Sequence, residues 1–246
     1  MGVPFVDIKS QHRKIAAEID SAVRRVFESC AFAGGPEVAA FEQAFADFLG
    51  AQYCIGVNSG TSALHLALIA AGVQAGDEVI CPAFTFISTA WVICYVGARP
   101  VFADIDPVTM NIAPASVEAC LTERTKCLLP VHLYGLPVDW DRLGRIAAAR
   151  HLPVVEDAAQ AHGARWRGRY VGTLGEFGCF SFYPTKNLGA CGEGGAVIAR
   201  EEEAAARLRR LRDHAQLRRY RHSEIGFNLR MEGIQGAVLA AKLPHL

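Results

Sequence analysis

The feature that most constrains the fold of this 246-residue chain is an alternation of short apolar runs with longer helical segments, beginning at Tyr53. Continuous apolar runs are typical of strands in mostly parallel sheets that helices cover on both faces. The alternation therefore predicts an α/β fold with three layers, α/β/α, around a mostly parallel sheet. Strands are predicted at residues 53–57, 78–81, 100–102, 127–131, 153–156, 178–182 and 196–199, and helices at residues 61–71, 86–96, 114–121 and 139–149.

Two further helices are predicted ahead of this alternation. Residues 11–28 have apolar side chains at helical spacing and a charged opposite face, and Gly34-Gly35-Pro36 then breaks the pattern. A second helix with one apolar side follows over residues 38–49. We therefore expect an N-terminal helical segment, residues 1–30, and a large domain, residues 31–246.

The last predicted elements are helices at residues 201–213 and 231–243, after which the sequence stops at Leu246. A doubly wound sheet usually has more chain after its last strand. We therefore expect this sequence to be truncated.

Charge and composition exclude several classes of protein. Twenty-five basic residues balance twenty-five acidic ones, so no overall field attracts nucleic acid or an acidic membrane. No apolar stretch approaches the roughly 18 residues that span a bilayer, and the first residues do not resemble a signal peptide. The eight cysteines lack zinc-type CxxC spacing and are interpreted as buried side chains in a reducing compartment. We expect a cytoplasmic protein with no metal site and no nucleic-acid or membrane partner.

Lys186 is the first candidate for chemistry. It follows the strand predicted at residues 178–182, and four glycines crowd positions 189 to 195 just after it. A lysine among small and apolar residues is poorly solvated, which lowers the pKa of its amine and makes it a usable nucleophile. An ordinary solvated loop lysine is the alternative that this segment alone leaves open.

The turn Ser59-Gly60-Thr61-Ser62 is a candidate phosphate site. A strand ends before it, Gly60 turns the chain, and a helix is predicted to open on Thr61. Free backbone N–H groups, hydroxyls and the positive end of the helix dipole suit a phosphate monoester. A plain Ser/Thr helix N-cap is the alternative.

Asp157 is predicted at the carboxyl end of a buried strand, the edge where open α/β sheets bind ligands. A carboxylate there is costly unless it meets a cation or a donor, and a protonated pyridine nitrogen is such a partner. The alternative is a helix-capping aspartate. Gln160 and His162 follow in the loop, where they either contact a ring or substrate or pack within the loop.

Phe86 follows another strand and brings an aromatic ring to the same edge, either to stack on a planar cofactor or as one more core phenylalanine. His132 also follows a strand and is interpreted as a structural histidine. A phosphate-binding turn, a stacking aromatic, a carboxylate and an amine are together what pyridoxal phosphate requires of a protein.

Ordered motifs run through the whole chain. They include Gly34-Gly35-Pro36-Glu37, Ser59-Gly60-Thr61-Ser62-Ala63-Leu64, Gly76-Asp77-Glu78-Val79-Ile80, Val131-His132-Leu133-Tyr134-Gly135, Glu156-Asp157-Ala158-Ala159-Gln160, Tyr183-Pro184-Thr185-Lys186-Asn187-Leu188-Gly189 and Gly226-Phe227-Asn228-Leu229-Arg230-Met231. With these motifs the chain resembles the DegT/DnrJ/EryC1/StrS family of sugar aminotransferases. The resemblance implies the large domain of a type I pyridoxal-phosphate-dependent transferase, without the smaller C-terminal domain that follows in relatives.

The resemblance also implies roles for the residues around the cofactor ring. Lys186 would bond covalently to the cofactor and shuttle protons, and Asp157 would keep the pyridine nitrogen protonated. Phe86 would stack on the ring, and Gln160 would touch its hydroxyl side.

At the other end of the cofactor, the resemblance implies that Gly60, Thr61 and Ser181 hold the phosphate. Asn228 would reach the phosphate from a second subunit, so a homodimer is expected.

The implied activity is transfer of an amino group from glutamate to a nucleotide-linked keto-deoxy sugar. The sequences Ala161-His162-Gly163 and Tyr183-Pro184-Thr185 most resemble those of family members that aminate the 3-keto position. One alternative is a sugar dehydratase, which the lysine at position 186 disfavours because dehydrating relatives have histidine there. Another is a non-catalytic cofactor-binding regulator or assembly partner. An NAD-dependent oxidoreductase is disfavoured because no GxGxxG follows the first strand.

Overall fold

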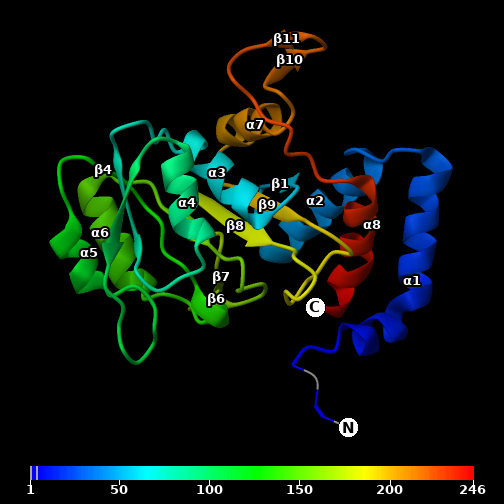
Figure 1. The fold of residues 1–246 in the computed structure, drawn as a ribbon, viewed down its shortest axis with the longest axis horizontal. Helices are drawn as coiled ribbons and strands as arrows, with labels where there is room; N and C mark the ends of the chain where they lie inside the picture. The colour runs from blue at the N-terminus through cyan, green and yellow to red at the C-terminus, as the bar shows by residue number, and fades with distance from the viewer. Residues whose placement is uncertain (1, 4) are drawn as a thin grey trace.

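The computed structural model describes residues 2–3 and 5–246, and a twisted sheet lies at its centre (Figure 1). One part of the sheet has the strand order β1 (Tyr53–Val57), β9 (Gly195–Ala199), β8 (Phe177–Ser181) and β5 (Val155–Asp157). The other part has the order β3 (Arg99–Ala103), β2 (Glu78–Pro82) and β4 (Thr125–Leu128).

The strand directions confirm the prediction of a mostly parallel sheet. β9 is antiparallel to β1 and β8, whereas β5 is parallel to β8, and β2 is parallel to both β3 and β4. Parallel bridges from Leu128 to Val154 and from Val131 to Asp157 join the two parts between β4 and β5. The carboxyl ends of β1, β2, β4, β5 and β8 therefore face the same way.

Helices cover both faces of this sheet. Buried side chains of α3, α4 and α7 pack with Val79 and Val197, whereas those of α2 and α8 pack with Ile198 and those of α5 and α6 with Ile80. Adjacent strand residues thus point to opposite faces, as the two-residue period of a strand requires, and the three-layer prediction is confirmed. The helices are α1 (Ile8–Ser29), α2 (Pro36–Leu49), α3 (Gly60–Ala70), α4 (Ser88–Tyr95), α5 (Pro114–Cys120), α6 (Trp140–Arg150), α7 (Glu202–Leu211) and α8 (Gly233–Lys242).

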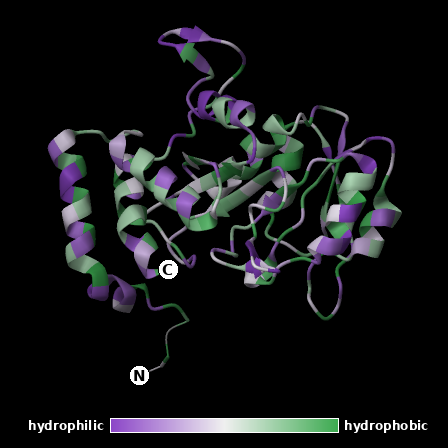
Figure 2. Cartoon of the chain, turned by 180° about the vertical axis from the view of Figure 1, so that it is seen from behind, coloured by the Kyte–Doolittle hydropathy of each residue, from purple (hydrophilic) through white to green (hydrophobic). Residues whose placement is uncertain are grey.

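The N-terminal and C-terminal helices meet at one side of the molecule, where α8 lies between α1 and α2 (Figure 1). Val238 of α8 packs on Ile15 and Ile19 of α1, and the neighbouring Leu239 belongs to the same cluster as Phe41 of α2. Figure 2 shows hydrophobic residues in the central strands and on the sides of the helices that face them.

Two small hairpins have no counterpart among the predicted elements. β6 (Arg165–Trp166) pairs with β7 (Arg169–Tyr170), and β10 (Gln216–Arg218) pairs with β11 (Arg221–His222). These strands have two or three residues and no apolar run that would mark them. Short 3-10 turns also occur as η1 (Leu133–Gly135) and η2 (Leu243–His245).

Most predicted boundaries differ from the observed ones by one to a few residues, and three of the differences bear on the region around the site. The strand predicted at residues 127–131 ends at Leu128, and the one predicted at residues 153–156 begins at Val155. Pro130 and Pro153 lie at these positions and have no N–H for a strand ladder. The helix predicted at residues 86–96 begins at Ser88, which leaves Phe86 in the preceding loop.

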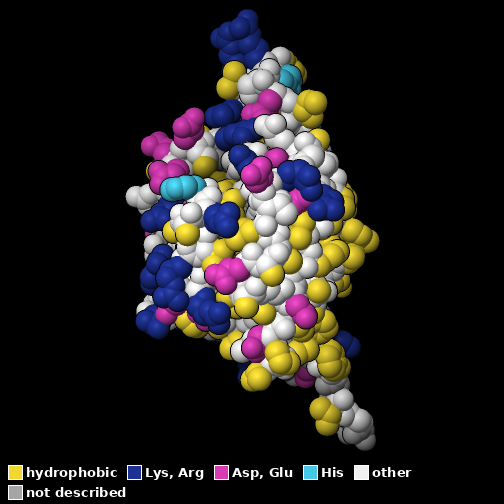
Figure 3. All heavy atoms as spheres, turned by 90° about the vertical axis from the view of Figure 1, so that its left-hand side faces the viewer, with side chains coloured by type: hydrophobic (Ala, Val, Ile, Leu, Met, Phe, Trp, Pro, Cys, Tyr) yellow, Lys and Arg dark blue, Asp and Glu magenta, His cyan; other side chains and the backbone are white. Residues whose placement is uncertain are grey.

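Charged side chains of both signs are spread over the face formed by the α5–α6 end of the molecule (Figure 3). Lys and Arg side chains gather at its upper tip, where the β10–β11 hairpin exposes Arg218, Arg219 and Arg221. Within residues 2–3 and 5–246, no helix is long and apolar enough to cross a membrane.

Candidate functional site

A cavity of about 620 Å³ opens at the carboxyl edge of the sheet. Ser59 follows β1, Thr85 follows β2, Val131 follows β4, and Asp157 and Ser181 end β5 and β8. This is the edge where open α/β sheets bind their ligands. The lining brings together seven of the eight residues predicted for the site: Gly60, Thr61, Phe86, Asp157, Gln160, Ser181 and Lys186.

The turn after β1 is both a helix cap and a wall of this cavity. α3 begins at Gly60 rather than Thr61, and the Ser59 side chain caps it by accepting a hydrogen bond from the Ser62 N–H at 3.1 Å. Thr61 Oγ1 donates to Ser88 Oγ at 2.9 Å. N–H groups in a first helical turn have no intrahelical acceptor, so those of Gly60 and Thr61 can serve an anion in the cavity.

Gly60 lies against Ser181 so closely that a side chain does not fit between them. A Cβ added at Gly60 would stand 2.6 Å from the Ser181 Cβ. Only glycine permits this approach, which brings the last residue of β8 to the first turn of α3. Gly60, Thr61 and Ser181 thus form one compact cradle of N–H and hydroxyl groups.

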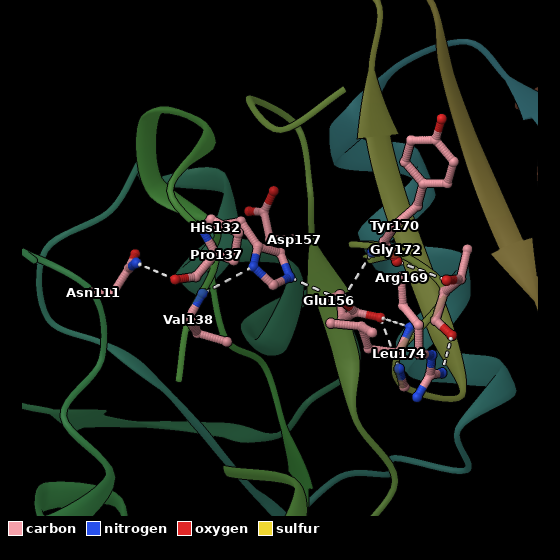
Figure 4. A network of polar contacts seen from close by, with 12 residues as sticks. Asn111, His132, Pro137, Val138, Glu156, Asp157, Arg169, Tyr170, Gly172 and Leu174 are labelled. Carbon is pink, nitrogen blue, oxygen red and sulfur yellow. Dashed lines mark hydrogen bonds and ion pairs between the residues drawn. The ribbon is translucent and has the colours of Figure 1, made fainter. Parts of the chain in front are cut away.

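Adjacent carboxylates at the end of β5 point to opposite sides of the strand (Figure 4). Asp157 lines the cavity, where its Oδ2 accepts from Thr89 Oγ1 at 2.9 Å and its Oδ1 accepts from the Ala159 N–H at 3.1 Å. Burial raises the pKa of Asp157, while these hydrogen bonds and the charge of Lys186 oppose the rise. The carboxylate is therefore costly to hold ionised and well placed to stabilise a cation.

Glu156 faces away from the cavity and is fully buried. Its Oε1 accepts from the N–H groups of Leu174 and Gly175, both at 2.7 Å, and its Oε2 accepts from the Gly172 N–H at 2.8 Å. The remaining partner is His132 Nε2 at 2.9 Å (Figure 4). Four donors thus surround one carboxylate, as a buried ionised acid requires.

His132 is a structural donor in this arrangement. The Val138 N–H donates to His132 Nδ1 at 3.2 Å, so Nδ1 is an acceptor and the ring proton is on Nε2, facing Glu156. The His132 N–H also donates to the backbone oxygen of Asp157 at 3.0 Å. These contacts agree with the structural interpretation of His132, and they fix the end of β4 to β5 beside the cavity.

Lys186 lies half-buried on the turn after β8, where its N–H donates to the Tyr183 oxygen at 2.8 Å. Burial lowers the pKa of its amine, and the charge of Asp157 acts in the opposite direction. A lowered pKa enlarges the neutral fraction, which is the form that attacks a carbonyl. A half-buried lysine that lines a cavity is not the solvated loop lysine of the alternative interpretation.

Phe86 and Gln160 both line the cavity. Phe86 is 72% exposed, so the alternative of a core phenylalanine is wrong and its ring is available for stacking. Gln160 Oε1 accepts from the Tyr134 N–H at 2.9 Å, which fixes the side chain and leaves its NH₂ group as the donor.

Asn228 is the predicted site residue that the structure does not bring into the cavity lining. It is exposed, and a backbone bridge pairs it with Asp213. His162 is buried beneath the site, with ring centroids 5.5 Å from Phe180 and 5.7 Å from Phe182. Within the described residues neither ring nitrogen has a hydrogen-bond partner, and burial lowers the pKa of His162 to about 4.

The cavity lining also includes polar residues to which the sequence analysis gave no role in holding the cofactor. Thr85 precedes α4 and Ser88 begins it, Tyr183 and Thr185 lie on the turn that contains Lys186, and Glu193 precedes β9. The position of Thr85 and Ser88 directly after β2 is the sequence signal that identifies them. No group of three or more metal-ligating side chains occurs within residues 2–3 and 5–246.

Known proteins are similar in sequence to this chain over almost its whole length. The chain is 43% identical over 241 residues to the UDP-2-acetamido-2-deoxy-3-oxo-D-glucuronate aminotransferase of Pseudomonas aeruginosa, covering 98% of this chain and 67% of that protein. It is 46% identical over 246 residues to a pleiotropic regulatory protein of Geobacillus stearothermophilus, covering 100% of this chain and 66% of that protein. The chain thus spans about two thirds of the length of these relatives.

Solved structures share the fold. The crystal structure of Streptomyces venezuelae DesV in complex with a ketimine intermediate superposes with a TM-score of 0.96 at 45% identity, covering 99% of this chain and 66% of that one. The Bacillus subtilis NtdA structure with bound cofactor PMP superposes with a TM-score of 0.92 at 32% identity, covering 99% of this chain and 56% of that one. The family description "DegT/DnrJ/EryC1/StrS aminotransferase family" matches residues 13–246, and the chain belongs to this family.

Proposed function

We propose that this protein is a pyridoxal-phosphate-dependent aminotransferase that moves an amino group from glutamate to a nucleotide-linked keto sugar. The observation that carries the proposal is the cavity in which Lys186 and Asp157 lie with an anion cradle at one end. An amine of lowered pKa, a buried carboxylate and a phosphate site are the groups that this cofactor requires.

The residues of the cavity fit the cofactor at both ends. Gly60, Thr61 and Ser181 would hold the phosphate in a cradle that a single added methyl group would fill. Asp157 would hold a proton on the pyridine nitrogen, because a buried carboxylate gains most from a cation in contact with it. The exposed ring of Phe86 would stack on the cofactor, and the NH₂ group of Gln160 would donate to its hydroxyl side.

When bound, the cofactor would supply a ring that accepts electrons from the carbon next to the transferred nitrogen. The chain itself would position this ring and move protons. Lys186 would hold the cofactor by its Nζ, then take a proton from the donor's carbon and return one to the sugar carbon. Asp157 would keep the ring nitrogen protonated throughout, and Phe86 would exclude water from one face.

The names of relatives support the sugar substrate and favour amination at the 3-keto position. One is the 3-oxo-D-glucuronate aminotransferase named above, and another, 45% identical over 244 residues, is the dTDP-3-amino-3,4,6-trideoxy-alpha-D-glucose transaminase of Streptomyces venezuelae. We extend this chemistry to the present chain, with a nucleotide-linked 3-keto sugar as acceptor.

A second candidate is a non-catalytic regulator that binds the same cofactor. The similarity to the pleiotropic regulatory protein favours it. The half-buried Lys186 beside Asp157 weighs against it, because binding alone does not require an amine of lowered pKa.

The test is an absorption titration of the purified protein with pyridoxal phosphate. We expect a yellow band that is absent in Lys186→Ala and that bleaches when glutamate is added. Addition of a nucleotide-linked 3-keto sugar should then restore the band. No band in the wild type would refute the cofactor assignment, whereas a band that no amino donor bleaches would favour the regulator.

We further propose that the protein acts as a homodimer in which Asn228 completes the neighbouring subunit's phosphate site. Asn228 is exposed and lies outside the cavity lining of its own subunit. Beside the cavity, Trp91 and Tyr95 of α4 and Ile87 just before it expose 50%, 56% and 47% of their surfaces, which offers an apolar face to a second copy.

Mixed dimers test this arrangement. The variants Lys186→Ala and Asn228→Ala should each have little activity, whereas a mixture refolded together should recover about a quarter of the wild-type activity. Half of the dimers would be mixed, and each would contain one site with both residues intact. No recovery in mixtures that form dimers would place Asn228 in its own subunit's site and refute the proposal.

A further inference from the structure

We propose that Thr89 is a positioning residue that orients the Asp157 carboxylate and holds it ionised, with Thr85 as the hydroxyl behind it. The inference rests on the proposed function, because it matters only if Asp157 faces a protonated ring nitrogen. Nothing in the motif pattern of the sequence separates Thr89 from the other small side chains of α4.

The geometry gives Thr89 this role. Its side chain is 1% exposed in the first turn of α4, and its Oγ1 lies 2.9 Å from Asp157 Oδ2. The Ala159 N–H donates a hydrogen bond to the other carboxylate oxygen, Oδ1, at 3.1 Å. With one donor on each oxygen, the plane of the carboxylate is fixed, and hydrogen bonds to charged groups are stronger than neutral ones.

The second hydroxyl sets the direction of the chain of hydrogen bonds. Thr85 Oγ1 lies 2.9 Å from Thr89 Oγ1, and Thr85 lines the cavity. An ionised Asp157 can only accept, so Thr89 must donate to it and Thr85 must donate to Thr89. A protonated Asp157 would reverse this order, because its O–H would then donate to Thr89 Oγ1. A hydrogen bond that Thr89 donates to the carboxylate stabilises the ionised form.

The other titratable groups around Asp157 do not by themselves account for stabilisation of its ionised form. The titratable groups whose charges act on Asp157 or respond to it are Lys186 on the turn after β8, His132 at the end of β4 and Cys179 in β8. His132 Nδ1 accepts the Val138 N–H and its Nε2 is directed at Glu156, and burial raises the pKa of the Cys179 thiol well above its usual value. Lys186 helps only while its amine is protonated, so Thr89 supplies the support that does not depend on the state of that amine.

The same turn of α4 also reaches the phosphate end of the cavity. Ser88, adjacent to Thr89, accepts from Thr61 Oγ1 at 2.9 Å. Two consecutive residues of one helix thus contact the anion cradle and the carboxylate. This helix therefore fixes the spacing between the two ends of the site, which a cofactor of fixed length requires.

The experiment measures binding of pyridoxamine phosphate by fluorescence from pH 5 to pH 9, because this ligand needs no covalent bond to Lys186. We compare the wild type with Thr89→Val, which keeps the shape and removes the hydroxyl, and with Thr89→Ser, which restores it. Thr89→Val should weaken binding at pH 7 by about 10- to 100-fold, the effect of one lost hydrogen bond to a charged group. The acid limb of its profile should move upward by about one to two pH units.

Thr89→Ser should remain within about threefold of the wild type, since it keeps the donor. Thr125→Val, which removes another buried hydroxyl in β4, is the control and should change neither affinity nor pH profile. If Thr89→Val fails to fold, Thr85→Val provides the same test, with a smaller shift of the acid limb in the same direction.

The outcomes separate this inference from the proposed function. No binding by the wild type would overturn both. Binding by the wild type with an unchanged affinity and acid limb in Thr89→Val, or in Thr85→Val where that variant replaces it, would overturn the role of Thr89 alone. Loss of binding in Thr89→Ser equal to that in Thr89→Val would also overturn it, because the hydroxyl would not be the cause.

Discussion

Replacing Glu156 by glutamine tests the buried network behind the site most severely. The carboxylate is 0% exposed, and each of its oxygens accepts two hydrogen bonds. A glutamine keeps one oxygen and turns the other into an NH₂ group that faces two N–H donors. His132 cannot relieve the conflict by moving its proton, because its Nδ1 already accepts from the Val138 N–H.

The magnitude follows from these contacts. Two hydrogen bonds to a charged group are lost, each with a value of about 1.5–3 kcal/mol. We therefore expect Glu156→Gln to lower the free energy of unfolding by about 3 to 5 kcal/mol, a large part of the total for an ordinary domain. The turn from Gly172 to Gly175 should lose its anchor, since three of its N–H groups bind this carboxylate.

The assay is urea unfolding at pH 7, followed by circular dichroism and extrapolated linearly to water. Glu18→Gln is the matched control, because Glu18 is 53% exposed and contacts only His245 Nε2 at 2.9 Å among its side-chain partners in the described residues. It should change the free energy of unfolding by less than about 1 kcal/mol. A loss below about 1 kcal/mol in Glu156→Gln would refute the description of Glu156 as a saturated buried anion.

Three further predictions concern other parts of the molecule. The pKa of His162 is about 4 in the folded protein and 6.5 in its unperturbed state, so between these pH values the unfolded chain binds more protons than the folded one. The free energy of unfolding should therefore fall by about 3 kcal/mol as the pH drops from 6.5 to 4. Urea unfolding of His162→Phe should show a weaker dependence of this free energy on pH. Gly60→Ala should lower the free energy of unfolding by about 1 to 3 kcal/mol, because the new Cβ would stand 2.6 Å from the Ser181 Cβ, and it should abolish cofactor binding. Adding Ser181→Gly should recover much of the lost stability. Full stability in Gly60→Ala would contradict the close approach of these two residues. Arg212→Gln should cost about 2 to 3 kcal/mol, because both Arg212 and Glu42 are mostly buried and water cannot easily replace the lost guanidinium. Arg25→Gln should cost less than about 1 kcal/mol, because Arg25 is 53% exposed and water can take its place beside Glu37. Equal costs by thermal unfolding would show that burial of the arginine is not the cause.

The sequence predicts much of this fold because its signals are local. The apolar runs of the central strands and the helical spacing between them identify the layers, and most boundaries agree within a few residues. The hairpins β6–β7 and β10–β11 escape prediction because they have no apolar period and depend on turns within polar loops. The rule that ligands bind at the carboxyl ends of parallel strands is enough to gather Gly60, Asp157 and Lys186 at one edge.

What the sequence could not give is the orientation of neighbouring side chains. Glu156 and Asp157 are adjacent carboxylates at one strand end, and only the packing of β5 between β4 and β8 determines which one faces the cavity. Thr89 resembles any small residue of a buried helix until α4 is placed over Asp157. Asn228 lies outside the lining of its own subunit's cavity, in agreement with the proposal that it serves the site of a second subunit.

A second lysine makes the central claim sharply testable. Lys242 is also buried, and burial lowers the pKa of its amine as it does that of Lys186. Its Nζ, however, donates to the Gly189 oxygen at 2.5 Å, and Lys242 is not among the residues that line the cavity. Of these two lysines, only Lys186 combines a lowered pKa with a position in the cavity lining beside Asp157.

The most direct measurement is borohydride reduction of the protein mixed with pyridoxal phosphate, followed by tryptic digestion and mass spectrometry. Reduction makes a covalent lysine–cofactor link permanent, so the modified residue can be read from the peptide mass. We expect a stoichiometric label on Lys186 and none on Lys242. A label on Lys242, or none on Lys186 at saturating cofactor, would contradict the assignment of this cavity as the cofactor site.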